Sequence, residues 1–297
     1  MKKRTDLQKQ EERTAYLFLL PSIAGFLVFM AYPAVLGLLL SFTNTNNLNS
    51  PLNFIGLANF RKLLHDNYFL ISLKNNIFYM LSFTPMVVAV SLLFAIILNR
   101  NILCRKFFRT VFFFPFISSM VAVAIIWNYI LSPNGPVNGF LISLGVESPP
   151  GWLLSKDWAM FAVVVISVWK EFGFYMVILL AGLQTIPEYL YEAAVIDGVK
   201  PWQKFRYITL PMVSPTMFLC IIMAVISSFQ VFDLVNVLTE GGPGNATNVL
   251  VFRIYREGFA NVKMGYASSI ALVLFVIVFV FSLIQFKLQD KWVNYNQ

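Results

Sequence analysis

The sequence has few charged residues and very few of the residue types that hold metals or form disulfides. Charged residues make up only 12% of the 297 residues, whereas soluble globular proteins carry about 25%. There is one histidine, His65, and there are two cysteines, Cys104 in a short basic segment and Cys220 inside an apolar run. Because these cysteines have no obvious route to each other, we expect neither a metal site nor a disulfide bond.

Motifs for nucleotide binding and for common catalytic sites are also absent from the sequence. None of the patterns GxxxxGK[ST], HExxH, CxxC or GxSxG occurs. The chain therefore has no Walker phosphate loop, and nothing in it indicates a catalytic triad. We expect no cofactor and no ATPase site in this chain. Basic segments interleaved with aromatic residues are absent too, which argues against a nucleic acid partner.

What the sequence does contain is long apolar runs. Apolar residues make up 58% of the chain and the mean hydropathy is +0.72, so membrane lipid is the expected solvent for much of the surface. A membrane-spanning helix needs about 20 mainly apolar residues. The predicted fold is all-α, an integral membrane bundle of six transmembrane helices in one domain, 15–297, after a cytoplasmic segment, 1–14. The six runs are 15–42, 76–99, 109–131, 158–183, 212–237 and 266–286.

Basic residues are unevenly distributed between the two sides of these spans. The net charge is +8, and one set of connecting segments holds 14 Lys and Arg residues against seven in the other set. Lys and Arg accumulate on the cytoplasmic side of membrane proteins. The sequence therefore predicts a multi-pass protein of the bacterial cell membrane with both termini in the cytoplasm. Pro21 and Pro33 lie in the first run and should kink or interrupt it.

The segment 184–211, between the fourth and fifth runs, resembles a compact helical hairpin. Thr185 and Glu188 have the spacing of a capping box, Gly198 is suited to end the helix, and Pro201 starts a second short helix. The apolar face of this segment should dock against another surface. It is equally consistent with an interfacial helix that packs on its own bundle.

The same segment carries a resemblance to a known family. Glu192-Ala193-Ala194, three residues, Gly198, nine residues, Ile208, one residue and Leu210-Pro211 resemble the EAA signature of ABC importer permeases. The resemblance extends along nearly the whole chain. Two further segments look like the carbohydrate-uptake branch, which includes permeases for oligosaccharides and for glycerol phosphate: Phe107-Phe108-Arg109 with Phe114-Pro115, and 238–244.

The resemblance implies a mechanical role for the 184–211 segment. It would be the coupling helix that sits in a cleft of an ATPase subunit and moves when two ATPases close on ATP. The implied partners are a second, similar permease, two ATP-binding cassette subunits and an extracellular or periplasmic sugar-binding protein. A permease for glycerol phosphate or a polyol is the nearest alternative, and an ion-coupled secondary transporter is the alternative from another class. The residues implied in coupling are Glu192, Ala193, Ala194, Asp197 and Gly198.

Polar residues inside the apolar runs are candidates for the substrate path, because burying them in a membrane is costly. Lys170 and Glu171 are adjacent in the fourth run, so they point in directions about 100° apart on a helix. Serine and glutamine residues lie near the middle of the fifth run. Sugar sites combine hydroxyl-matching polar groups with aromatic faces, and the candidates are Trp169, Glu171, Tyr175, Ser228 and Gln230.

Two alternatives remain open for these polar residues. Ser227 and Ser228 would also suit a bond to a neighbouring helix. Lys170 and Glu171 would also suit pairing with charges of a partner subunit. The sequence does not define the roles of Lys170 and Asp233.

Overall fold

The computed structural model describes residues 6–46, 52–100 and 102–293. Within these ranges the chain is helical, and its only strand-like pairing is an isolated bridge between Thr43 and Phe54. The N-terminal basic residues 2–4 lie outside the described residues. The helices are α1 Asp6–Phe26, α2 Tyr32–Leu40, α3 Ala58–Leu63, α4 Asn67–Asn99, α5 Arg105–Ile117, α6 Met120–Ile130, α7 Pro136–Ser143, α8 Ala159–Gln184, α9 Glu188–Ile196, α10 Pro201–Lys204, α11 Leu210–Phe229, α12 Asp233–Leu238, α13 Leu250–Tyr255 and α14 Met264–Gln289, with π-helical segments η1 Leu27–Ala31, η2 Phe205–Thr209 and η3 Arg256–Ala260.

Five helical runs in the described ranges are long and apolar enough to cross a membrane, and a bent pair of helices makes six if it counts as one span. The prediction of an all-α membrane bundle is thus confirmed. The five runs are Glu11–Leu40, Asn67–Asn99, Ala159–Gln184, Pro201–Phe229 and Met264–Gln289, and the bent pair is Arg105–Ile117 with Met120–Ile130.

The third span departs from the straight helix expected over 109–131. Its two halves, α5 and α6, meet at an angle of 97°. Pro115 lies in the last turn of α5, where it removes a backbone N–H, and Ser118 and Ser119 have extended backbone angles. The expectation of one continuous helix was wrong here, because hydropathy records only that both halves are apolar.

The fifth span also differs from its predicted range, 212–237. It begins at Pro201, since α10 continues through η2 into α11, and it ends at Phe229. The predicted helix start at Pro201 is confirmed, but this helix continues into the fifth span instead of being separate. Ser227, Ser228 and Gln230 lie at the end of this span rather than near its middle, because the chain leaves the helix before α12 begins.

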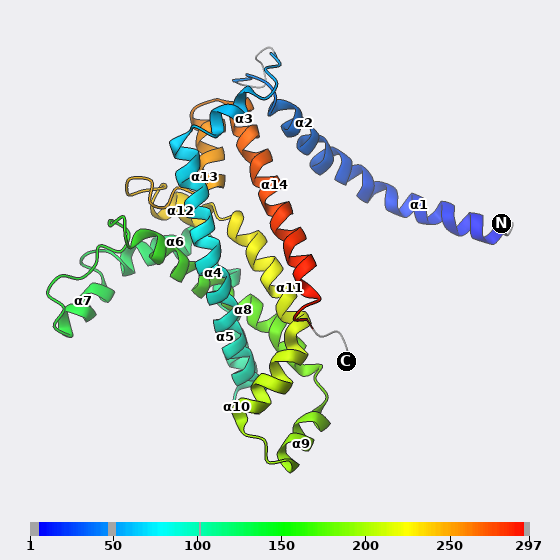
Figure 1. Cartoon of the computed structure of the whole chain (residues 1–297), viewed down its shortest axis with the longest axis vertical. Helices are drawn as coiled ribbons and strands as arrows, with labels where there is room; N and C mark the ends of the chain where they lie inside the picture. The colour runs from blue at the N-terminus through cyan, green and yellow to red at the C-terminus, as the bar shows by residue number, and fades with distance from the viewer. Residues whose placement is uncertain (1–5, 47–51, 101, 294–297) are drawn as a thin grey trace. The chain divides into compact units, whose positions relative to one another are not determined.

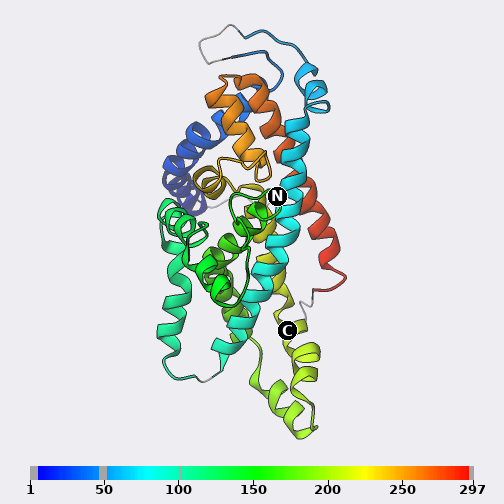
Figure 2. The same ribbon diagram turned by 90° about the vertical axis from the view of Figure 1, so that its left-hand side faces the viewer.

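The chain divides into two compact units. One unit contains the described residues up to Leu63 together with Ile254–Val273, and the other contains Leu64–Arg253 and the described residues from Leu274 onward. The second unit holds α4 to α12 and is the larger of the two. Figures 1 and 2 show α4, α8 and α11 of this unit side by side, with α9 at the same end as the start of α5.

The core of the larger unit is the contact between α4 and α8. Phe83 and Val87 on α4, and Val163, Met176 and Leu179 on α8, are all fully buried. Close packing of these side chains gains dispersion energy and leaves few voids. The two helices therefore form a fixed frame on which polar side chains of the same unit are positioned.

Helix α5 approaches α8 very closely at Gly173. A Cβ atom built on Gly173 would collide with the backbone carbonyl of Phe112 on α5. Small residues at helix crossings in membranes let two backbones approach in this way. Gly173 therefore sets how near α5 lies to α8.

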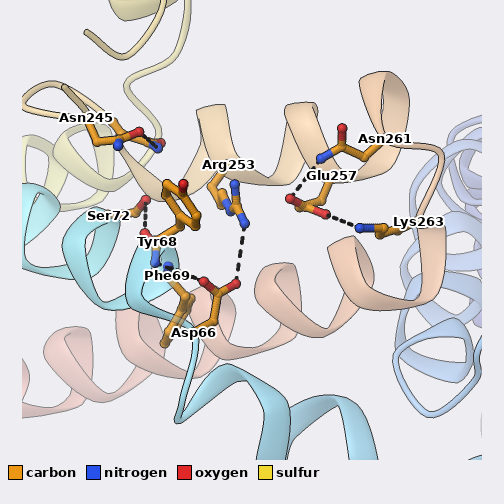
Figure 3. Close-up of polar contacts among 10 residues, drawn as sticks. Asp66, Tyr68, Phe69, Ser72, Asn245, Arg253, Glu257, Asn261 and Lys263 are labelled. Carbon is orange, nitrogen blue, oxygen red and sulfur yellow. Dashed lines mark hydrogen bonds and ion pairs between the residues drawn. The ribbon is translucent and has the colours of Figure 1, made fainter. Parts of the chain in front are cut away.

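In the smaller unit, polar side chains hold the segment after α2. The Asn59 amide donates to the carbonyls of Ser41 (3.1 Å) and Thr43 (2.9 Å), and the Ser269 hydroxyl donates to the same Ser41 carbonyl at 2.8 Å. Buried Glu257 accepts a hydrogen bond from the Asn261 amide at 3.0 Å, and the Lys263 ammonium lies 3.9 Å from its other oxygen. The first set of bonds joins α3 and α14 to the segment after α2, and the contacts of Glu257 join η3 to the segment before α14 (Figure 3).

The first span, in the same unit, is one run from Glu11 to Leu40. Pro21 lies within α1 without ending it, while η1 comes directly before the turn that contains Pro33. The expected interruption is thus a widened π-helical turn before Pro33, where the missing N–H of proline would otherwise leave a carbonyl unbonded.

Candidate functional site

A cavity of about 200 Å³ lies in the larger unit, between α4, α8 and the end of α11. Residues at the start of α6 and of α12 complete its wall. Polar side chains converge on it from helices that are far apart in the sequence. The lining residues are Tyr79, Met120, Ser167, Glu171, Ser227, Gln230, Val231, Phe232, Asp233 and Leu234.

Glu171, on α8, is at the centre of the polar contacts in this cavity. The Ser227 hydroxyl of α11 donates a hydrogen bond to a Glu171 carboxylate oxygen at 3.3 Å. Tyr79 and Tyr175 lie close enough to interact electrostatically with the same carboxylate. The expectation that a serine of this run bonds a neighbouring helix is thus confirmed for Ser227.

Lys170 points away from the cavity, as its position next to Glu171 on the helix predicts. Its ammonium donates to the backbone carbonyls of Pro115 (3.2 Å), Phe116 (3.1 Å) and Ser118 (2.9 Å). The last carbonyls of a helix have no partner within the helix, so Lys170 supplies the donors that α5 lacks where it breaks. Lys170 is only 7% exposed, and its ammonium makes three hydrogen bonds within this chain.

The structure brings some of the predicted substrate residues together and not others. Glu171 and Gln230 line the cavity. Ser228 is fully buried outside the lining, and its hydroxyl donates to the Val225 carbonyl of its own helix at 2.6 Å. Tyr175 is buried one turn after Glu171.

Trp169, the remaining predicted residue, lies outside the cavity lining. It is 39% exposed and packs edge-on against Trp127 of α6, with ring centroids 5.4 Å apart. This contact joins α8 to the second half of the broken span. Its indole face is therefore partly used in helix packing.

Sequence reasoning did not select Tyr79, Ser167 or Asp233, which also line the cavity. Ser167 precedes Glu171 by four residues and so shares its helix face, a signal that was available. Tyr79 comes from a helix remote in sequence, and no local pattern connects it to Glu171. Asp233, whose role the sequence left open, opens α12 and faces the cavity.

A set of asparagine bonds holds the end of α11 beside α4. The Asn76 amide donates to the Ser228 carbonyl at 3.2 Å, and the Asn76 carbonyl oxygen accepts from the Leu250 N–H at 2.7 Å. The Asn75 amide donates to the carbonyls of Asn245 and Asn248, each at 2.9 Å. The loop between α12 and α13 is thereby attached to α4 near the cavity.

A second attachment lies at the beginning of α4 (Figure 3). Asp66 caps this helix by accepting from the N–H groups of Tyr68 (2.9 Å) and Phe69 (3.4 Å). Its other oxygen lies 3.4 Å from the Arg253 guanidinium of α13, which stacks over the Tyr68 ring. Asp66 therefore both starts α4 and links it to α13.

Helix α9 ends in a left-handed turn, as its sequence predicts. Gly198 has a φ of +69° and its N–H donates to the Val195 carbonyl at 3.1 Å, while the Val199 N–H donates to the Ala194 carbonyl at 3.0 Å. The expected capping box at its start was wrong. Pro187 occupies the cap position without a side-chain bond, and the Thr185 hydroxyl donates back to Gly182 of α8 at 2.8 Å.

The two sides of α9 differ. Ala194 is buried, and the Tyr191 hydroxyl lies 3.0 Å from the Thr209 hydroxyl, so one side packs on the fifth span. Glu192 and Ala193 are exposed on the described chain, as is Ile196, which is 86% exposed. The helix therefore packs on its own bundle and still presents a free, partly apolar side.

The chain matches known proteins along its whole length. The model of the family described as binding-protein-dependent transport system inner membrane component matches residues 87–294. The lactose transport system permease protein LacF of Rhizobium radiobacter is 34% identical, with 95% of this chain and 96% of that protein covered. The arabinooligosaccharides transport system permease protein AraP of Bacillus subtilis is 33% identical, with 97% and 92% covered.

Solved structures agree with these matches. One is a chain of a bacterial ABC transporter involved in the import of the acidic polysaccharide alginate, which is 27% identical and has a TM-score of 0.82. The alignment covers 98% of this chain and 100% of that chain. A bacterial alginate transporter in complex with an alginate pentasaccharide-bound periplasmic protein gives 26% identity and a TM-score of 0.83, with 97% and 98% covered. With the family model covering more than half of the sequence, the chain belongs to the binding-protein-dependent transport system inner membrane components, which are transport subunits without an ATPase site of their own.

Proposed function

We propose that this chain is one permease subunit of an ATP-driven importer that brings an oligosaccharide into the cytoplasm by alternating access. A second homologous permease would complete the path, two ATP-binding cassette subunits would supply the energy, and an extracellular or periplasmic protein would deliver the sugar. Relatives named for lactose and for arabinooligosaccharides support this substrate class.

One observation carries the proposal, namely the continuous helix Pro201–Phe229 of 29 residues. One end of this helix is joined to α9 through the contact between Tyr191 and Thr209. Near its other end, Ser227 bonds Glu171 in the cavity wall. A push on α9 would therefore reach the cavity through a single rigid element, which is what coupling between ATP hydrolysis and substrate release requires.

The exposed side of α9 is the proposed ATPase contact. Glu192 would offer a carboxylate to a basic partner, and Ala193 would allow close backbone approach. Asp197 and Gly198 form the turn that ends the helix. Ala194 would act differently from the others, because it is buried against its own chain.

The cavity is the proposed substrate site. Glu171 and Gln230 would bind sugar hydroxyls directly, together with Ser227. Tyr175 and Ser228 would support the site from behind, and Trp169 would be an aromatic face at its border. In this arrangement α9 and both termini are cytoplasmic. The basic residues between the end of α4 and the start of α5 would lie on the same side, as the Lys and Arg bias of membrane proteins predicts.

A permease for glycerol phosphate or a polyol is the second candidate. The sn-glycerol-3-phosphate transport system permease protein UgpA of Yersinia enterocolitica is 33% identical over 95% of this chain and 95% of its own length. That identity is similar to the identity of the sugar relatives. Substrate tests must therefore include both classes.

The decisive experiment is ATP hydrolysis and solute uptake in proteoliposomes. The chain is reconstituted with its neighbouring permease, the ATPase and the binding protein, and oligosaccharides, polyols and glycerol phosphate are tested in turn. Stimulation by one loaded binding protein supports the proposal. Uptake that needs an ion gradient and no ATPase would replace it with a secondary transporter.

Coupling through α9 is tested by a matched pair of glycine substitutions. Gly198→Val and Gly145→Val impose similar backbone strain, because both glycines have positive φ (+69° and +89°) and neither has a neighbour within 4 Å of a built Cβ. We expect Gly198→Val to leave ATP hydrolysis active but to lower transport per ATP, whereas Gly145→Val leaves this ratio unchanged. Equal ratios in both variants would contradict the proposed role of α9.

A further inference from the structure

We infer that the cavity accepts an uncharged sugar unit and excludes substrates that carry a carboxylate or phosphate at this position. The inference rests on the proposed function, since it assumes that the cavity is on the sugar path. Two observations support the inference, namely the charged residues that line the cavity and the position of Lys170 outside it.

The wall contains two carboxylates and no cation. Glu171 and Asp233 line the cavity together with hydroxyls and an amide, and none of the described lining residues is Lys, Arg or His. Sites for carboxylate or phosphate ligands normally use Arg, Lys or backbone N–H groups as donors. The cavity offers no such cationic donor, and the oxygens of its two carboxyl groups accept hydrogen bonds.

Lys170, the basic residue next to Glu171 on α8, interacts electrostatically with Glu171 but does not line the cavity. The Lys170 ammonium is bound to three backbone carbonyls at the break of the third span. Turning it toward the cavity would leave those carbonyls without donors, which is costly in a membrane. An anionic ligand in the cavity would therefore receive no hydrogen bond from a cation of this helix.

Sugar hydroxyls fit these acceptors. The Glu171 carboxylate receives one hydrogen bond, from Ser227, and an ionised carboxylate can accept several. Asp233, at the first turn of α12, is exposed and is one of the residues that line the cavity. Carboxyl oxygens at both positions can accept hydrogen bonds from sugar hydroxyls, and neither residue offers a positive charge to an anionic group.

The size of the cavity limits what it holds. Its volume of about 200 Å³ is below the roughly 300–1,000 Å³ of usual small-molecule sites. It therefore suits part of a saccharide, such as one ring, rather than a whole oligosaccharide. The charge rule accordingly applies to the unit that occupies this cavity.

The relatives make this inference specific to the chain. One of them is named for sn-glycerol 3-phosphate and the structural neighbours import the acidic polysaccharide alginate, whereas others are named for lactose and arabinooligosaccharides. Likeness of fold therefore does not decide the charge of the substrate. The acidic lining places this chain with the transporters of neutral sugars.

The test is uptake by the complete reconstituted complex with its binding protein. Neutral oligosaccharides of glucose, galactose and arabinose are compared with mannuronate and galacturonate oligosaccharides and with glycerol 3-phosphate. We expect ATP-dependent uptake of a neutral sugar and none of the anionic compounds. Uptake of a uronate or of glycerol 3-phosphate would overturn the inference and leave the importer proposal standing, whereas no stimulation by any sugar would overturn the importer proposal itself.

Variants then assign the discrimination to this cavity. In Glu171→Gln with Asp233→Asn we expect the kcat/KM for the neutral sugar to fall about tenfold relative to wild type, and the share of uronate in total uptake to rise from the wild-type background. Asp157→Asn, which removes an exposed acidic residue outside the lining, should change neither value.

Asp233→Asn alone covers the case in which the double variant does not assemble, because Asp233 is exposed and lies in a short helix. An unchanged share of uronate in the uptake by an assembled variant would show that the charge discrimination lies elsewhere and would refute the inference.

Discussion

Lys170 offers a direct test of what stabilises the break in the third span, because its ammonium donates three hydrogen bonds to carbonyls at that break. Lys170→Met keeps the length and the apolar stem and removes the donors. The Pro115 carbonyl still accepts from the Ser118 N–H at 3.2 Å. The Phe116 and Ser118 carbonyls would have no other donor among the described residues.

The expected cost follows from those two carbonyls. Each unsatisfied buried acceptor costs about 1–3 kcal/mol. Removing a buried ammonium recovers part of this, because the charge itself is costly to place in a membrane. We expect a net loss of about 2–4 kcal/mol in the free energy of unfolding.

The assay is thermal and denaturant unfolding of the purified assembly, with two controls. Lys170→Arg keeps several donors and should retain most of the stability. Lys74→Met makes the same chemical change at an exposed position on α4 and should have little effect. Spin labels on α5 and α6 would report whether the 97° angle opens in the methionine variant.

Two outcomes would refute the reasoning. Wild-type stability of Lys170→Met would mean that the carbonyls find other partners. A loss in Lys170→Met with an unchanged distance between the labels on α5 and α6 would mean that Lys170 stabilises the fold without determining the bend.

Three further substitutions test the contacts of α4 and α8 by the same unfolding measurement. Gly173→Ala should lower the free energy of unfolding by about 1–3 kcal/mol, because a Cβ would collide with the Phe112 carbonyl. The control Gly139→Ala on α7, where a Cβ would have nothing within 4 Å, should be neutral or slightly stabilising. Equal effects would disprove the close approach of α5 and α8. Asn76→Ala should cost about 2–4 kcal/mol by leaving a buried carbonyl and a buried N–H unpaired, and a loss below 1 kcal/mol would mean that neither bond matters. Asp66→Ala should cost about 0.5–2 kcal/mol as a lost helix cap, whereas Asp66→Asn should recover most of this value, and failure of that recovery would assign the effect to the ion pair with α13 instead.

The membrane class, the helical fold and most span positions were predictable from the sequence, because hydropathy and chain length act locally. Lipid leaves a backbone almost no alternative to a helix over about 20 apolar residues. The left-handed turn at Gly198 was also predictable, since it depends on glycine alone. So was the divergence of Lys170 and Glu171, which follows from adjacent positions on one helix.

Tertiary structure alone decided where the helices break and which polar groups meet. The carbonyls at the bend between α5 and α6 receive hydrogen bonds from a lysine more than 50 residues later in the chain. The cavity joins Tyr79, Glu171 and Asp233 from three helices that no local pattern relates. Convergence of this kind is set by helix crossing and close approach, which are properties of packing and not of any single segment. The sequence by itself therefore determined what kind of protein this is, and only the packed structure decided which of its polar residues form the site.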